Sequence, residues 1–390
     1  MRPIPVRQVR GRWRLAVPGA ALALLALSFA GAAVPAGASV TGRAASSAVQ
    51  GLSPGFNRPG NILIADQFNN RVIEVTPRGG IVWHFGLGPT DFSRRSIIGT
   101  NDAQRVGDFT LMAGTGIPPG VDPVAPNGVA DNRVLLVNPA GKVVWRYGRF
   151  GVAGSGPNQL NTPVQNTWLP NGDVLITDQA NERIIEVRPS DNGVGGKIVW
   201  QYGTTGTAGN GPNQLNNPNS AELLRNGHVL IADENNNRAI EVEKTGSMGG
   251  NIVATFTAGG TASGVAFASR LRNGDTLITD SNNSRIVEVD GNDNVVWQYF
   301  TNTDPNSNPA PLPTRAVRLR NGDTLISDQF NARVIEVTPG KSIVRQFGNL
   351  NQPGFGTSST QQGLNEPYDA KVIGDYTGLT PPSGGQDNQG

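Results

Sequence analysis

Short runs in which apolar and polar residues alternate recur along the chain and predict β-strands. The stretch Asn321–Val337 reads NGDTLISDQFNARVIEV. In it, two alternating segments follow the period of a half-buried strand. Asn-Gly before the first segment predicts a tight hairpin turn, because Gly tolerates the positive φ that such a turn needs. Close copies of this stretch occur at Asn171–Val187, Asn226–Val242, Asn273–Val289 and Gly60–Val75.

These units form a repeat across most of the chain. A sixth, damaged copy lies at Gly107–Val137, where an insertion, Gly114–Asn127, separates its two strands. A further strand follows each unit, as in the IVWQYG run from Ile198. Each unit would then have four strands, and the third, such as RVIEV from Arg333, starts with an Arg. The distances between successive copies of this Arg are 62, 50, 55, 47 and 48 residues. Repeats of this length made only of short strands are typical of propeller blades. The sequence therefore predicts an all-β fold, a six-bladed β-propeller.

The two ends of the repeat region complement each other. The first unit starts at Phe56 and lacks a first strand, whereas Pro367–Ile373 resembles the first strands of other units. We expect this C-terminal strand to pair with the Asn61–Phe85 unit, closing the first blade and removing exposed sheet edges. The predicted propeller spans residues 56–379, and the Gly/Gln/Asn-rich residues 380–390 are predicted to be a disordered tail.

The N-terminus has the order of a secretory signal peptide. Five Arg residues precede an apolar run from Leu15 to about Val34, and Ala36-Gly37-Ala38 follows. We predict cleavage after residue 38, with residues 39–55 as a linker and the mature protein secreted. The alternative is a membrane anchor, but the run contains Pro18 and is short of the roughly 20 strongly apolar residues of a full span. We expect no stable membrane insertion after cleavage.

Charge and cysteine content narrow the possible partners. The full chain carries 32 basic and 30 acidic side chains, so removing the five Arg of the leader leaves 27 basic ones and a net charge of about −3. A nucleic-acid partner is not expected, because no basic stripe remains to neutralise phosphates. The chain has no Cys, which excludes disulfides and thiolate metal sites.

The repeats resemble those of NHL-type β-propellers. The similarity lies in the Asp…Asn-x-Arg turn and in the linkers Gly154–Pro163 and Gly209–Pro218. The segment NDAQRVGDFTLM from Asn101 and the NGDTLITD runs are also similar to the propeller of bacterial arylsulfotransferases. The resemblance covers nearly all of residues 56–379. It implies the fold, whereas such propellers have many functions.

An Asp and an Arg that flank the same hairpin turn recur in five units. Because a group present in almost every blade serves the blade, we interpret these pairs as structural rather than as a ring of charged ligands. Losing one partner of a buried pair would cost roughly 3–5 kcal/mol. The pairs are Asp66/Arg71, Asp178/Arg183, Asp233/Arg238, Asp280/Arg285 and Asp328/Arg333. The Trp residues of the fourth strands, which also recur at one position, are predicted to pack between blades.

The sequence offers little for metal or acid–base chemistry. It has two His, His84 and His228, neither with a second His at ligand spacing. Arylsulfotransferases and NHL-type amidating lyases rely on several histidines, so no catalytic residue and no metal ligand is carried over to this chain. We predict no cofactor. Asp290–Asn294 is a candidate calcium site, because its side chains carry the oxygen ligands that calcium takes, although the same residues suit a plain turn.

Residues at the starts of the first strands are the candidate ligand-binding site, because they face the mouth of the central channel. They vary from blade to blade, unlike the hairpin Asp and Arg. The candidates are Asp102, Gln165, Arg315, Tyr368 and Asp369. Arg315, Asp369 and Asp102 come from three consecutive blades, and two carboxylates beside a guanidinium suit a polar ligand or acid–base work. We expect them to be exposed, with the insertion 114–127 at the rim. The alternative is a solvated rim without a ligand.

These features favour a non-enzymatic extracellular binding scaffold for a glycan, a peptide or a protein. The alternative is an enzyme acting at the channel mouth, either a hydrolase, a lyase or an arylsulfotransferase-like protein. The sequence does not identify the ligand.

Overall fold

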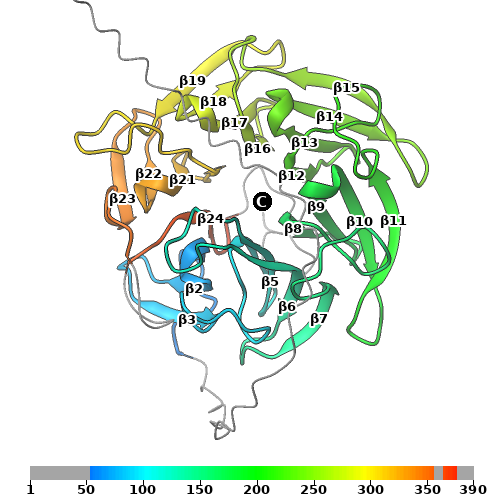
Figure 1. Ribbon diagram of the computed structural model, residues 1–390. Helices are drawn as coiled ribbons and strands as arrows, with labels where there is room; N and C mark the ends of the chain where they lie inside the picture. The colour runs from blue at the N-terminus through cyan, green and yellow to red at the C-terminus, as the bar shows by residue number, and fades with distance from the viewer. Residues whose placement is uncertain (1–52, 355–362, 376–390) are drawn as a thin grey trace, which may run out of the picture.

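The structure is a computed structural model that describes residues 53–354 and 363–375. Six four-stranded sheets stand around a central channel, as in Figure 1. Every pairing within a sheet is antiparallel, and consecutive strands are neighbours except where β24 joins β1. The prediction of an all-β, six-bladed propeller is confirmed. The predicted signal peptide and C-terminal tail lie outside the described residues.

Each blade has four strands that run outward from the channel. The inner strands of blades 1 to 6 are β24 (Pro367–Val372), β4 (Thr100–Val106), β8 (Pro163–Trp168), β12 (Pro218–Leu223), β16 (Val265–Arg270) and β20 (Arg315–Arg318). The second strands are β1 (Ile62–Asp66), β5 (Phe109–Ile117), β9 (Val174–Asp178), β13 (Val229–Asp233), β17 (Thr276–Asp280) and β21 (Thr324–Asp328). The third strands are β2 (Arg71–Val75), β6 (Val129–Val137), β10 (Arg183–Pro189), β14 (Arg238–Lys244), β18 (Arg285–Val289) and β22 (Arg333–Val337). The outer strands are β3 (Ile81–Phe85), β7 (Val143–Gly148), β11 (Gly196–Tyr202), β15 (Gly250–Phe256), β19 (Val295–Phe300) and β23 (Ile343–Gly348).

A single 3-10 turn joins the second and third strands in five blades. These turns are η1 (Gln67–Asn69), η2 (Gln179–Asn181), η3 (Glu234–Asn236), η4 (Ser281–Asn283) and η5 (Gln329–Asn331). Each ends on a residue in the left-handed region, which Asn tolerates well. Asn70 and Asn237 fit that expectation, but Ala332 adopts the same conformation with φ 53°. The turn, held by the Asp and Arg on either side, therefore imposes the conformation.

The C-terminal strand closes the first blade as predicted. β24 pairs with β1 in a register that places Ile62 opposite Val372 and Ile64 opposite Ala370. The ring is therefore fastened by a strand that lies about 300 residues away in the sequence from its partner, and the inner edge of blade 1 is covered.

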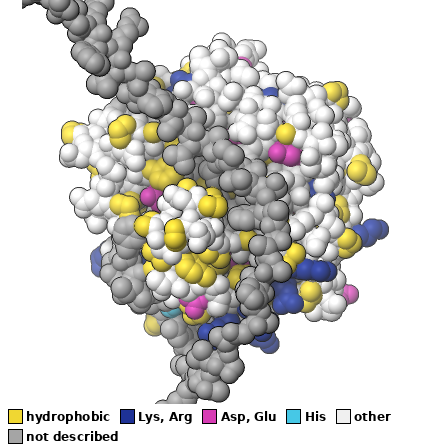
Figure 2. Space-filling model, viewed as in Figure 1, with side chains coloured by type: hydrophobic (Ala, Val, Ile, Leu, Met, Phe, Trp, Pro, Cys, Tyr) yellow, Lys and Arg dark blue, Asp and Glu magenta, His cyan; other side chains and the backbone are white. Residues whose placement is uncertain are grey.

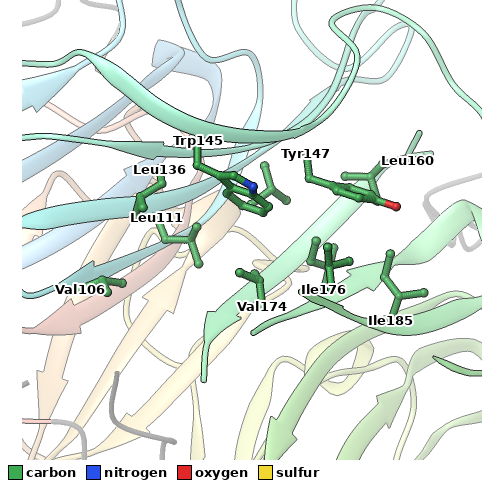
Figure 3. Packing of buried hydrophobic residues seen from close by; sticks show 11 residues of the cluster. Val106, Leu111, Leu136, Trp145, Tyr147, Leu160, Val174, Ile176 and Ile185 are labelled. Carbon is green, nitrogen blue, oxygen red and sulfur yellow. The ribbon is translucent and has the colours of Figure 1, made fainter. Parts of the chain in front are cut away.

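Apolar side chains of neighbouring blades interlock to form the core. At the seam between blades 2 and 3, Trp145 and Tyr147 of β7 pack over Val174 and Ile176 of β9 (Figure 3). Large aromatic rings contribute most of the buried apolar area at such a contact. The indole N–H of Trp145 also donates to the carbonyl of Gly195 in the next blade, at 3.0 Å.

The same bond recurs for the Trp of three other outer strands. Each indole N–H donates to a carbonyl in the loop between the third and outer strands of the following blade. These bonds are Trp83 to Pro139 (2.9 Å), Trp200 to Gly249 (3.2 Å) and Trp297 to Pro339 (3.0 Å). The predicted packing of these Trp residues between blades is confirmed.

Blade 2, the damaged copy, keeps the Asp–Arg pair by a different route. Gly114 faces Arg133 where the other blades have Asp, and the carboxylate comes instead from Asp131, two residues before the Arg. Asp131 binds the Arg133 guanidinium and accepts the backbone N–H of Ile98 at 2.8 Å. Only Gly fits at position 114, because a Cβ there would lie 2.4 Å from the Asp131 carboxylate.

The insertion in blade 2 lengthens the hairpin of β5 and β6. Its apolar residues, Ile117 and Ala125, pack against Phe68 and Ile98 at the seam with blade 1. On the other side, the hydroxyl of Thr115 donates to a carbonyl of blade 3 at 2.6 Å. The insertion thus ties blade 2 to both neighbours. None of the helices in the described ranges has the length and apolar character that crossing a membrane requires.

Candidate functional site

The repeated Asp–Arg pairs meet across the turn of their own blade. The Arg Nε lies 2.6–2.8 Å from a carboxylate oxygen in Asp66/Arg71, Asp178/Arg183, Asp233/Arg238, Asp280/Arg285 and Asp328/Arg333. Asp178 shows the full pattern, because it also accepts from Asn181 at 2.8 Å and from the backbone N–H of Asn161 at 2.8 Å. Burial raises the pKa of Asp178, and Arg183 and these hydrogen bonds oppose that effect. The pair thereby fixes the turn and the entry to the inner strand together.

Inner-strand side chains form a second repeated contact, this time between blades. In blades 1 to 4 the third residue of the inner strand supplies an oxygen that accepts a backbone N–H of the next blade's inner strand. The bonds run from Ala103 to Asp369 (3.1 Å), from Asn166 to Asp102 (3.1 Å), from Ala221 to Gln165 (2.7 Å) and from Ala268 to Ser220 (3.3 Å). The varied chemistry at this position therefore has a structural explanation, because carboxylate, amide and hydroxyl oxygens all serve as acceptors.

Asp102, Asp369 and Arg315 converge in the channel. The Arg315 guanidinium lies 3.2 Å from Asp102 and 3.0 Å from Asp369. Lys371 joins them, with its Nζ 2.7 Å from Asp102, 2.6 Å from Asp369 and 2.8 Å from the carbonyl of Ala103. We call Asp102, Asp369, Arg315 and Lys371 the channel cluster. Its two negative and two positive charges balance.

Burial of the channel cluster corrects the expectation of an exposed rim. Asp102 and Asp369 have no exposed surface, and Arg315 and Lys371 expose 1% and 4%. The Arg315 guanidinium also lies over the Phe267 ring, 4.3 Å from its centroid. Neighbouring inner strands crowd this part of the channel, so the charged groups face one another instead of solvent. Long-range screening by salt is correspondingly weak there.

The pKa values of the two carboxylates of the channel cluster are shifted in opposite directions. Burial raises the pKa of Asp102, and the negative Asp369 adds to the rise, so Lys371 and Arg315 do not fully compensate. Burial acts on Asp369 as well, but Lys371, Arg315 and their hydrogen bonds outweigh it and lower its pKa. Two carboxylates that share a site repel each other when both are ionised, so the pKa of one of them is raised. Asp369 is therefore the more firmly ionised member.

Uncharged and weakly charged side chains form a layer beside the channel cluster, at the end where the inner strands begin. Tyr368 of blade 1 reaches blade 4, on the opposite side of the ring, where its hydroxyl receives a 2.9 Å hydrogen bond from Asn219. Asn219 also donates to Glu234 of η3 at 2.9 Å. Gln67 of η1 donates to Asn101 at 2.8 Å and accepts from Gln329 of η5 at 2.7 Å. We call these six residues the mouth layer.

Glu234 is the one member of the mouth layer that is partly exposed. Burial raises its pKa to about 7, against the hydrogen bonds from Asn219 and Asn217. Burial and the nearby Glu234 raise the pKa of Tyr368, which keeps its proton. Glu234 thus changes charge near neutral pH while the groups around it do not. Charged side chains are sparse on the face seen in Figure 2, where the described residues are mainly uncharged.

Both histidines lie away from the channel. His84 is in the outer strand β3, and burial lowers its pKa. His228 lies in the hairpin turn just before β13, and its Nδ1 is 2.7 Å from Glu241. In residues 53–354 and 363–375, no three His, Cys, Asp or Glu gather as a metal site would require. Asp290, the calcium candidate, accepts the backbone N–H groups of Asn292 and Asn294 within its own turn. Calcium binding stays a prediction.

Of the sequence candidates, Asp102, Arg315 and Asp369 come together, and Tyr368 lies in the adjoining layer. Gln165 is buried between blades 3 and 4, bound to the backbone of Ala221. Lys371 was not among the residues predicted from the sequence. It lies two residues after Asp369, which places both side chains on one face of a strand, and this spacing is the sequence signal that could have identified it.

The fold and this site define the class of protein as a six-bladed β-propeller. No protein-family model matches the chain, and no curated protein matches it in sequence. Among solved structures, it is similar to a protein of unknown function from Bacteroides caccae, with 14% identity and a TM-score of 0.50 over 74% of this chain and 93% of that one. Virginiamycin B lyase from Staphylococcus aureus (14% identity, TM-score 0.46, 76% of this chain and 86% of that one) is also similar. So is a chain of a nidogen/laminin complex (10%, 0.47, 74% and 92%). These likenesses extend to the fold alone.

Proposed function

We propose that this protein is a secreted binding scaffold and that its ligand, an extracellular glycan, binds at the mouth layer. The observation that carries the proposal is the mouth layer itself, in which amide, hydroxyl and carboxyl groups from four blades form one hydrogen-bonded layer beside the channel, with Glu234 partly exposed. Such groups both donate and accept hydrogen bonds, as sugar hydroxyls require. The resemblance to NHL-type repeats and the Arg-rich leader support a secreted scaffold of this kind.

In this proposal the channel cluster supports the ligand site and does not react. A base or nucleophile for the enzymatic alternative has to be free to take a proton or attack a substrate. Each charged group of the channel cluster instead holds at least two partners in the described structure. Asp102, Asp369, Arg315 and Gln165 therefore position the inner strands. Glu234, the partly exposed member of the mouth layer, contacts the ligand, and Tyr368 holds Asn219, which in turn binds Glu234.

The test is a glycan array probed with the mature protein, residues 39–390, followed by calorimetry on the glycans that bind. Tyr368→Phe removes a hydroxyl from the mouth layer, and Glu234→Gln replaces an acceptor oxygen by an NH2 donor, so both should weaken binding. Glu243→Gln, on an exposed residue of β14, is the matched control and should bind normally. Affinity should depend little on salt, because a glycan binds through uncharged groups. A glycan whose affinity survives both mouth substitutions would show that it binds elsewhere, and capture of peptides alone would make the scaffold a peptide binder.

A further inference from the structure

One position of the outer strand decides how each seam between blades is filled. The residue there pairs with the fourth residue of the third strand, counted from and including its Arg, and it is the third or fifth residue of its own strand. It is Trp in blades 1, 2, 3 and 5, Ala254 in blade 4 and Arg345 in blade 6. Where it is Trp, the indole ring lies against the next blade and its N–H bonds that blade's loop, as described above. Blades 4 and 6 therefore lack the ring that fills the other four seams.

The seam after blade 4 is covered by another side chain. Arg270, from the inner strand of blade 5, lies over the Phe256 ring at 5.3 Å and binds Glu241 at 2.8 Å. The seam between blades 6 and 1 has no such cover among the described residues. The inner strand of blade 1 offers the short Val372 at this position, and Arg345 turns back to Glu336 of its own blade at 3.3 Å.

A cleft of about 190 Å³ lies at this seam. We call it the seam cleft. The outer-strand aromatic beside it is also less covered than its counterparts, because Phe347 is only partly buried whereas Tyr147 and Tyr202 expose 1% and 0%. The apolar residues that line the seam cleft are Ile64, Ile73, Val75, Ile81, Phe347 and Leu364.

The walls of the seam cleft repeat the walls that hold a Trp ring elsewhere. Ile64, Ile73 and Leu364 stand where Ile176, Ile185 and Leu160 stand in blade 3. In Figure 3 those three residues of blade 3 lie beside the Tyr147 ring, whose counterpart here is Phe347. Val75 and Ile81 stand where Val187 and Ile198 stand, and those two residues belong to the same cluster as Trp145. The seam cleft is thus the space of a missing indole ring, and Gly79 in its wall belongs to the loop that accepts the indole N–H in other blades.

We propose that the seam cleft binds the indole ring of a small soluble molecule. An apolar cavity of roughly 150 Å³ holds a benzene ring, whereas drug-sized ligands need about 300 Å³ or more. The seam cleft therefore holds one ring system and little else. The loop carbonyl of Pro77, which corresponds to the acceptors Pro139 and Pro339, would receive the ring N–H. This site is separate from the mouth layer and does not depend on the proposed function.

Indole itself is the probe. Isothermal titration and saturation-transfer NMR on the mature chain should show saturable binding at one site, weaker for 1-methylindole because it lacks the N–H donor. Arg345→Trp should abolish binding, since the new side chain fills the seam cleft as Trp145 fills its own seam. Lys142→Trp, on an exposed turn, is the matched control and should bind indole normally.

A second variant guards against a folding defect in the first. Leu364→Phe narrows the seam cleft from the other wall and should also weaken indole binding, while Arg345→Ala should leave it intact because Arg345 points to Glu336. Absence of saturable binding to the unaltered chain, or unchanged binding by Arg345→Trp, would overturn the proposal. Tighter binding of N-acetyltryptophanamide than of indole would overturn the assignment to a free small molecule and indicate a protein side chain.

Discussion

Replacing Lys371 by Met tests whether the channel cluster stabilises the ring through charge balance. Met preserves the apolar stem of the side chain but removes an Nζ that binds Asp102, Asp369 and the carbonyl of Ala103, all within 2.8 Å. Two buried carboxylates then share the single guanidinium of Arg315. Removing one partner from a buried ion pair costs about 3–5 kcal/mol. Because a typical protein is stable by about 5–15 kcal/mol, the loss should be large.

Urea unfolding of a protein comprising residues 39–390 at pH 7 measures this loss, with Lys142→Met as the control on an exposed turn. A second substitution, Asp102→Asn, should restore much of the stability of Lys371→Met. It leaves one carboxylate for one guanidinium and keeps an oxygen to accept the backbone N–H of Asn166. The double-mutant cycle should therefore give a coupling energy of at least about 1 kcal/mol.

The pH dependence of Lys371→Met follows from the pKa of Asp102. Burial and Asp369 already hold this pKa above its usual value, and loss of Lys371 removes a group that lowers it. The folded state then binds a proton more tightly than the unfolded state, so the stability deficit should shrink as the pH falls toward the unfolded pKa. A cost below about 1 kcal/mol at pH 7, or simple additivity with Asp102→Asn, would refute charge balance as the role of the channel cluster.

Three other substitutions test separate parts of the ring. Burial raises the pKa of Glu222 to about 8, so its contribution to the free energy of unfolding should fall by up to about 1.4 kcal/mol per pH unit as the pH rises from 5 to 8. Glu222→Gln should flatten this slope, whereas the control Glu243→Gln should not. Equal slopes for the two variants would contradict the assignment. Gly114→Ala should cost about 1–3 kcal/mol in urea unfolding because its Cβ would lie 2.4 Å from Asp131, whereas Gly291→Ala, with open space around it, should be nearly neutral. Truncation after Asn349 removes β24 and should lower the melting temperature of the whole ring in one transition, so an unchanged melting temperature would contradict closure by this strand.

The blades could be predicted from the sequence because their signals are local. Alternating strands, the Asn-Gly turn and the Asp–Arg pair all lie within about 17 residues, and each copy supports the others. Even the closing strand was predictable, since a missing first strand at one end matched an extra one at the other. The turn conformation of Ala332, by contrast, follows from the surrounding contacts and not from the residue type.

The chemistry of the channel was only partly predictable. Asp102, Asp369 and Arg315 were predicted to lie at the mouth and do meet, but their variation between blades was interpreted as a sign of ligand binding. In four blades the side chain at this position instead accepts a backbone N–H of the next blade, and carboxylate, amide and hydroxyl oxygens all serve. Burial and the partner Lys371 depend on how six inner strands approach one another, which no single repeat encodes.

Pairs of positions in adjacent blades carry information that single repeats hide. Glu74 in the third strand of blade 1 binds Arg105 of the next inner strand at 2.6 Å, and Glu288 binds Arg318 in the same way at 2.8 Å. In blade 2 the Glu is replaced by Leu136, and the facing Arg is replaced by Trp168, which packs edge-on against Trp145. An ionic seam and an apolar seam are thus alternative solutions to one packing problem.

At the seam between blades 6 and 1, neither the ionic nor the apolar arrangement is complete. Glu336 provides the acidic side chain of an ionic seam, but Val372 replaces the Arg that faces the Glu in other blades. The positive charge comes instead from Arg345, at the position that Trp occupies in four blades. The inner strand that brings Val372 also brings Asp369 and Lys371 to the channel cluster, so one C-terminal strand closes the ring, balances its buried charge and leaves the seam cleft open. A side chain long enough to fill the seam from position 372 would therefore remove the cleft without disturbing the channel cluster, because residues 371 and 372 point to opposite faces of the strand.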